Sequence, residues 1–120
     1  MESTAVIVDG LAGLELRMTS QPVYDRPFFL RLLHEDPRTG AEHYLVRYPA
    51  ELVAQRHRHT AAHTIVVLEG GLEVNRRTVG PGSYCHFPAG EPMHHAPAAG
   101  QSCLFVIMFD GPFDVEVLSS

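Results

Sequence analysis

Glycine and proline interrupt this sequence at intervals of about ten residues, and the segments between them are rich in valine, isoleucine, leucine and aromatic residues. Short apolar segments separated by turns are typical of an all-β sandwich or barrel. No segment keeps the period of a helix, although residues 11–18 could form one or two helical turns. We therefore expect an all-β chain in which helix is a minor component. The expected strands cover residues 28–35, 41–49, 63–69, 72–79, 83–87, 93–96, 103–109 and 113–118.

The length of the chain suits one domain. Its 120 residues can bury a single hydrophobic core without disulfide bonds, and no repeat, low-complexity tract or linker divides them. We predict one domain over residues 1–120. The N-terminal sequence MESTAVIVDG lacks the basic and long apolar regions of a secretory signal, and Cys85 and Cys103 have no CxxC spacing. We expect a cytoplasmic protein with reduced thiols.

Charge and apolar patterning limit the possible partners. A net charge of −5 gives no electrostatic basis for binding nucleic acid or an anionic membrane surface. The longest apolar run, CLFVIMF at 103–109, is far shorter than the roughly 20 residues that span a bilayer. This run and TIVVL at 64–68 are apolar on both faces, which suits strands covered by the barrel interior and by a second sheet or subunit. We predict a homodimer that binds a small molecule, and no nucleic acid or membrane partner.

Histidine is the residue type that stands out chemically. The chain has no lysine, which excludes Schiff-base catalysis, but it has the segment HRHTAAH at 57–63. In an extended strand His57, His59 and His63 would point to the same side, whereas a helix would separate the first two. Three neutral imidazoles form an open site for Zn, Fe, Ni, Cu or Co. The alternative is that they are surface histidines on an exposed strand.

The segment HRHTAAHTIVVLEG resembles the first motif of the cupin superfamily, which combines H-x-H with a glutamate and a later glycine. His57, His59 and Gly70 match this motif, and His63 stands where the glutamate is expected. The resemblance implies a metal site in which one anionic ligand has been replaced. Such a site is less suited to hard ions such as Mg or Mn.

The segment GSYCHFPAGEPMHH resembles the second cupin motif, and the matching positions are Gly82, Pro88 and Gly90. Met93 falls at the position of the motif histidine, and His94 and His95 follow it. A bulge that absorbs Met93 would turn His94 inward, whereas strict alternation from Met93 would turn His95 inward. The two motifs span about residues 51–96, and together they imply a single cupin domain, a double-stranded β-helix or jelly-roll barrel.

The cupin resemblance implies one divalent transition metal ion, with Fe or Zn ahead of Ni, Cu and Co. The predicted metal ligands are His57, His59, His63 and His94, with His95 as the alternative to His94. The tyrosines Tyr44, Tyr48 and Tyr84 offer phenols whose facing the sequence does not settle.

The resemblance also implies a function, that of a metal-dependent cupin enzyme. HRHT followed by another histidine is similar to a motif of dioxygenases that cleave hydroxyacetophenone-like carbon bonds. We expect an Fe(II)-type dioxygenase that acts on a small aromatic or diketone-like compound. The alternatives are a zinc cupin of the polyketide cyclase or isomerase type, and a non-catalytic cupin that senses a metal or ligand.

Overall fold

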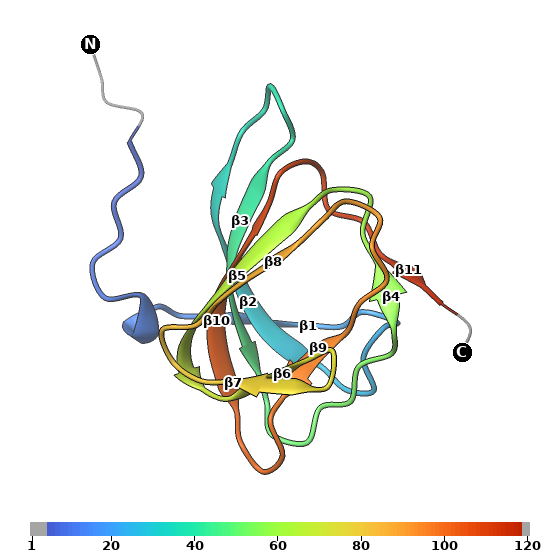
Figure 1. Cartoon of the computed structure of the whole chain (residues 1–120). Coiled ribbons are helices and arrows are strands. Elements are labelled where there is room, and N and C mark those ends of the chain that lie inside the picture. The colour runs from blue at the N-terminus through green and yellow to red at the C-terminus, as the bar shows by residue number, and fades with distance from the viewer. Residues whose placement is uncertain (1–4, 119–120) are drawn as a thin grey trace.

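The protein is described by a computed structural model over residues 5–118, and nearly all of its regular structure is strand (Figure 1). A short 3-10 helix, η1, covers Leu11–Gly13. The strands are β1 (Arg17–Thr19), β2 (Phe28–Glu35), β3 (Glu42–Tyr48), β4 (His57–Arg58), β5 (His63–Gly70), β6 (Leu72–Val74), β7 (Arg77–Val79), β8 (Tyr84–Phe87), β9 (His95–Pro97), β10 (Cys103–Phe109) and β11 (Glu116–Val117). Within residues 5–118 no helix is long and apolar enough to cross a membrane.

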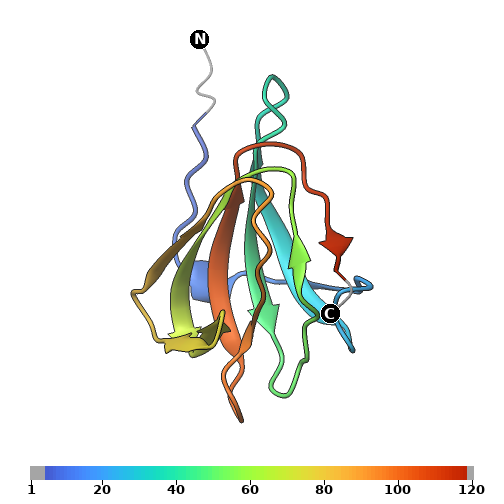
Figure 2. The same cartoon turned by 45° about the vertical axis from the view of Figure 1, so that its right-hand side comes forward.

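The strands form the two layers of a jelly-roll (Figures 1 and 2). One layer is a six-stranded antiparallel sheet in the order β1-β2-β3-β10-β5-β8. The other layer contains the small sheets β11-β4 and β7-β6-β9. A bridge between His57 and Met93 joins these two sheets, since each backbone N–H donates to the other residue's carbonyl, at 2.9 and 2.7 Å. The all-β jelly-roll predicted from the sequence is confirmed.

The hydrophobic core lies between the two layers. Ile65, Val67 and Phe105 contribute from the six-stranded sheet, and Leu72 and Met93 contribute from the other layer; all five side chains are at most 1% exposed. Burying each side chain of this size stabilises the fold by about 1.5–3 kcal/mol. The buried histidines lie next to this core, since the rings of His63 and His95 contact Phe87 and Phe105.

The turn signals located most strands correctly. Strands β2 and β10 coincide with the expected segments 28–35 and 103–109. The expected strand 72–79 is instead split into β6 and β7, because Asn75 and Arg76 adopt left-handed backbone conformations, with φ of 46° and 72°.

The extended strand that would turn His57, His59 and His63 to the same side does not form as one element. Strand β4 ends at Arg58, and β5 begins at His63 in the six-stranded sheet. Between them, the backbone N–H and the hydroxyl of Thr60 both donate to the carboxylate of Asp114, which holds the chain out of strand geometry. The histidines of this segment therefore approach one another from different sheets rather than along one strand.

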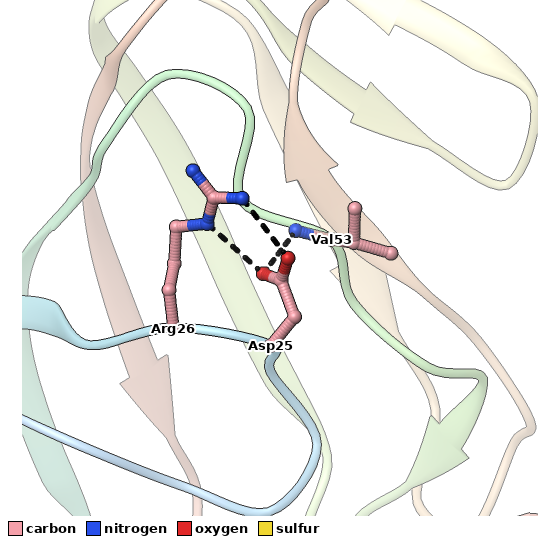
Figure 3. A network of polar contacts seen from close by, with 3 residues as sticks. All are labelled: Asp25, Arg26 and Val53. Carbon is pink, nitrogen blue, oxygen red and sulfur yellow. Dashed lines mark hydrogen bonds and ion pairs between the residues drawn. The ribbon is translucent and has the colours of Figure 1, made fainter.

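A polar latch joins the segment before β2 to the segment before β4 (Figure 3). The Asp25 carboxylate accepts a 2.8 Å hydrogen bond from the Val53 backbone N–H, and the Asp25 N–H donates to the Val53 carbonyl at 3.1 Å. The same carboxylate pairs with Arg26 at 3.1 Å. Tyr24 and Ala54 form an adjacent antiparallel bridge. The latch fixes the backbone position of Tyr24.

Candidate metal centre

Three buried histidines meet inside the barrel. His57 belongs to β4, His59 follows that strand, and His95 begins β9. One ring nitrogen of each lies within 4.8 Å of the other two, and the side chains are only 1, 6 and 2% exposed, respectively. Three imidazoles at this separation could hold one metal ion.

Each of these three rings is oriented by a hydrogen bond at Nδ1. The partners are the Gln55 backbone carbonyl for His57 (2.8 Å), the Asp114 backbone carbonyl for His59, and the Tyr48 hydroxyl for His95 (2.7 Å). A carbonyl can only accept, so Nδ1 carries the proton in His57 and His59. Their Nε2 atoms then keep the free lone pair that a metal ligand needs.

The unpartnered atoms in this region fit a metal ion. Nε2 of His59 and Nε2 of His95 are buried without a hydrogen-bond partner among the described residues. Leaving a buried polar atom without a partner lowers the stability of the fold by about 1–3 kcal/mol. A bound ion that accepts these lone pairs would remove this cost. Neutral imidazole nitrogens suit Zn, Fe, Ni, Cu and Co, and the donor set therefore agrees with a transition metal.

His63 adds a fourth buried imidazole beside the group. Its ring centroid lies 4.7 Å from that of His59 and 5.9 Å from that of His95, and the ring stacks on Phe87 at 4.8 Å. The side chain is 1% exposed, and neither ring nitrogen has a hydrogen-bond partner in the described part of the chain. His63 thus borders the site from the six-stranded sheet with both nitrogens free.

Burial keeps all four histidines neutral. Loss of solvation is the largest cause, and it lowers the pKa of His57 to about 4 and that of His63 to about 3. It lowers the pKa of His59 as well, and that of His95 well below its ordinary value. Neutral histidine is the form that binds a metal, so protons compete weakly with the ion at neutral pH.

The structure separates the two candidates of the second motif. Met93 and His95 are 1% and 2% exposed, whereas His94 is partly exposed and uses its backbone N–H and carbonyl to bond Asn75. The alternation that starts at Met93 continues without a bulge. His95 therefore joins His57 and His59, and the assignment of any of these residues as a metal ligand remains a prediction.

An aromatic cavity of about 170 Å³ borders the three histidines. Its polar side chains, apart from the histidines, come from Gln21, Tyr24, Tyr44 and Tyr48. Its apolar wall includes Phe28, Val46, Phe105, Ile107, Phe109 and Phe113. A small apolar or aromatic molecule could therefore lie against the histidine group.

The sequence did not reveal the groups that orient the histidines. The side to which Tyr48 points is not visible in the sequence alone. In the structure, the two-residue period of β3 places it on the same face as Tyr44 and Val46. The acceptors of Gln55 and Asp114 are backbone carbonyls, which leave no side-chain signature.

A sequence model of the ChrR cupin-like domain matches residues 21–114, which include both histidine motifs and the cavity wall from Gln21 to Phe113. The chain belongs to the ChrR cupin-like family. No curated protein matches the sequence of this cupin domain.

Solved structures share the fold of this ChrR cupin-like domain. An acetylacetone dioxygenase from Acinetobacter johnsonii has a TM-score of 0.77 at 19% identity, with 100% of this chain and 87% of that chain covered. A cupin-like protein from Thermotoga maritima has a TM-score of 0.77 at 18% identity, covering 90% and 89%. The polyketide cyclase RemF from Streptomyces resistomycificus has a TM-score of 0.74 at 22% identity, covering 97% and 87%. At such identities the similarity establishes the cupin fold.

Proposed function

We propose that this cupin is a metal-dependent dioxygenase that acts on a small aromatic or diketone-like carbonyl compound. The observation that carries the proposal is the convergence of three neutral, buried histidines at the wall of an aromatic cavity. The fold shared with an acetylacetone dioxygenase supports this choice of reaction class.

In this proposal His57, His59 and His95 hold the metal ion, and His63 is the fourth ligand. Ferrous iron, when bound, would supply the one-electron chemistry that dioxygen requires. The protein residues have simpler tasks. The Nδ1 partners hold the rings of His57, His59 and His95 in place. The aromatic wall binds the substrate and excludes water.

A zinc cyclase or isomerase is the second candidate, and His63 is the observation that favours it. Four imidazoles without a carboxylate form a ligand set that suits zinc, which would act as a Lewis acid on a substrate carbonyl. The fold shared with the polyketide cyclase RemF agrees with this possibility.

The ligand set can be tested by measuring metal content after purification without added metal. We expect His57→Ala and His95→Ala to lose most of the metal, because one of three or four ligands is missing. His94→Ala is the matched control, since it removes the neighbouring histidine from outside the group, and it should retain the metal. Near-stoichiometric metal in His57→Ala or His95→Ala would contradict the assignment.

The reaction can be tested with an oxygen electrode. Iron-loaded protein should consume dioxygen when a β-diketone or a hydroxyaryl ketone is added, and His95→Ala should not. Tight retention of zinc, with no substrate-dependent uptake by the iron-loaded protein across a panel of such compounds, would refute the dioxygenase and favour the cyclase.

A further inference from the structure

A chain of hydrogen bonds leads from the histidine group to the cavity. His95 Nδ1 bonds the Tyr48 hydroxyl at 2.7 Å, and the Tyr48 hydroxyl bonds the Tyr24 hydroxyl. His95 is the only one of the three histidines whose Nδ1 partner is a hydroxyl rather than a backbone carbonyl. A hydroxyl both accepts and donates, so it can pass the direction of a hydrogen bond to a further group.

The proposed metal site fixes the direction of this chain. If Nε2 of His95 binds the ion, the neutral ring carries its proton on Nδ1 and donates it to the Tyr48 oxygen. The Tyr48 proton must then point to the Tyr24 oxygen, its other hydrogen-bond partner. Tyr24 accepts this bond, and its own proton is left to donate elsewhere.

The Tyr24 hydroxyl has no other hydrogen-bond partner among the described residues, and Tyr24 lines the cavity. The hydroxyl protons of the other two phenols in the cavity already take part in hydrogen bonds within the protein. Tyr44 donates to the Glu42 carboxylate, and Tyr48 is used at both its donor and its acceptor side. Tyr24 is therefore the phenol that offers a free donor to a bound molecule.

Packing holds the Tyr24 side chain in this position. Its ring meets Phe28 and Tyr48 edge to face, with centroids 4.9 and 5.2 Å apart, and the bridge to Ala54 fixes its backbone. Burial raises the pKa of Tyr24 to about 12, so the hydroxyl keeps its proton at neutral pH. The donor is both rigid and protonated before any ligand arrives.

We propose that Tyr24 is a specificity-determining residue, which selects ligands that bring a carbonyl oxygen to its hydroxyl while their apolar part fills the aromatic cavity. This inference rests on the proposed function, because metal binding through His95 sets the direction of the chain. The inference names the part of the ligand that the cavity recognises, which is its carbonyl oxygen.

The test compares acetophenone with α-methylstyrene. The two ligands have nearly equal shape, but α-methylstyrene has a C=CH₂ group where acetophenone has its C=O group. Their affinities are measured by ligand-observed NMR titration with zinc-loaded protein, so that no turnover occurs. Wild type should bind acetophenone more tightly. Tyr24→Phe should reduce this preference about 2- to 12-fold, the range that one neutral hydrogen bond contributes. Direct contact between carbonyl and metal would affect both proteins alike.

Tyr44→Phe is the matched control, because it also removes a phenol hydroxyl from the cavity wall, but one whose proton goes to Glu42. It should keep the wild-type ratio of affinities, and all three proteins should hold equal zinc. Three results would overturn this inference and leave the proposed function intact. They are a zinc-loaded wild type that shows no preference for acetophenone, a Tyr24→Phe protein with the wild-type ratio of the two affinities, and a Tyr24→Phe protein that has lost its zinc. A wild type that binds no zinc or iron would overturn the proposed function and this inference together.

Discussion

The buried histidines should make the metal-free protein unusually sensitive to mild acid. An unfolded histidine has a pKa near 6.5, whereas burial lowers the pKa of His57 to about 4 and that of His63 to about 3. At pH 5 both residues are charged in the unfolded chain and neutral in the fold. The unfolded state therefore binds more protons, and the free energy of unfolding falls as the pH falls.

The expected loss follows from these values. The stability contributed by the neutral rings is fully present above pH 6.5 and is lost as the pH falls from there toward the folded-state values. Each ring contributes about 1.4 kcal/mol per pH unit, or about 2 kcal/mol between pH 6.5 and pH 5. His57 and His63 together contribute a loss of about 4 kcal/mol, and His59 and His95 act in the same direction.

The carboxylates whose pKa is lowered do not obscure this window. Hydrogen bonds from Thr60 lower the pKa of Asp114, and the hydrogen bond from Val53 is the largest cause that lowers the pKa of Asp25. A group with a lowered acidic pKa loses its stabilising contribution only below the unfolded value, which is 3.8 for aspartate. Between pH 7 and pH 5 the contribution of these two aspartates therefore stays nearly constant, while that of the buried histidines changes.

The assay is urea unfolding followed by circular dichroism at pH 7, 6 and 5 in the presence of a chelator. With an m value of about 2 kcal/mol per molar urea, the midpoint should fall by about 2 M from pH 7 to pH 5. His63→Leu should lose about 2 kcal/mol less than wild type over the same range. His86→Gln, which changes an exposed histidine of β8, should follow wild type. A wild-type loss below about 1 kcal/mol, or no difference for His63→Leu, would refute the reasoning.

Two further predictions concern the scaffold. Gly70 has a φ of 73°, and an added Cβ would collide with the Ser102 carbonyl oxygen. Gly70→Ala should therefore lower the free energy of unfolding by about 3 kcal/mol or more in urea denaturation. Gly80→Ala is the control, because its Cβ would meet nothing within 4 Å, and it should stay within about 0.5 kcal/mol of wild type. Strand β8 lies at the edge of the six-stranded sheet and leaves 69% of Tyr84 exposed. Because pairing between two chains would cover such an edge, we expect a homodimer. Light scattering at micromolar concentration should then give about twice the chain mass of 13.3 kDa, and a mass near that of one chain would exclude the homodimer.

Strand positions could be predicted from the sequence because turn residues and apolar runs are local signals. Residues 28–35 show this well, since the turn at 36–40 ends the strand where the sequence indicates. The break after Arg58 could not be predicted in this way. It depends on Asp114, which lies 54 residues after Thr60 and binds it only in the folded chain.

The histidine group was predicted in part for the same reason. His57 and His59 were expected to converge, and the structure brings them together, although not along one strand to His63. The choice between His94 and His95 depended on whether a bulge occurs after Met93. The backbone bridge between Met93 and His57 settles that facing, and a pairing between distant segments is not visible in a local pattern.

The hydrogen bonds that aim the three histidines close loops of very different length. His57 uses a carbonyl two residues away, whereas the bond of His95 to Tyr48 spans 47 residues and that of His59 to Asp114 spans 55. Contacts between distant residues cost more loop-closure entropy than local contacts do. In a refolding chain the rings of His59 and His95 are not oriented until these distant pairings have formed. The proposed metal site should therefore bind its ion tightly only once the native fold is complete.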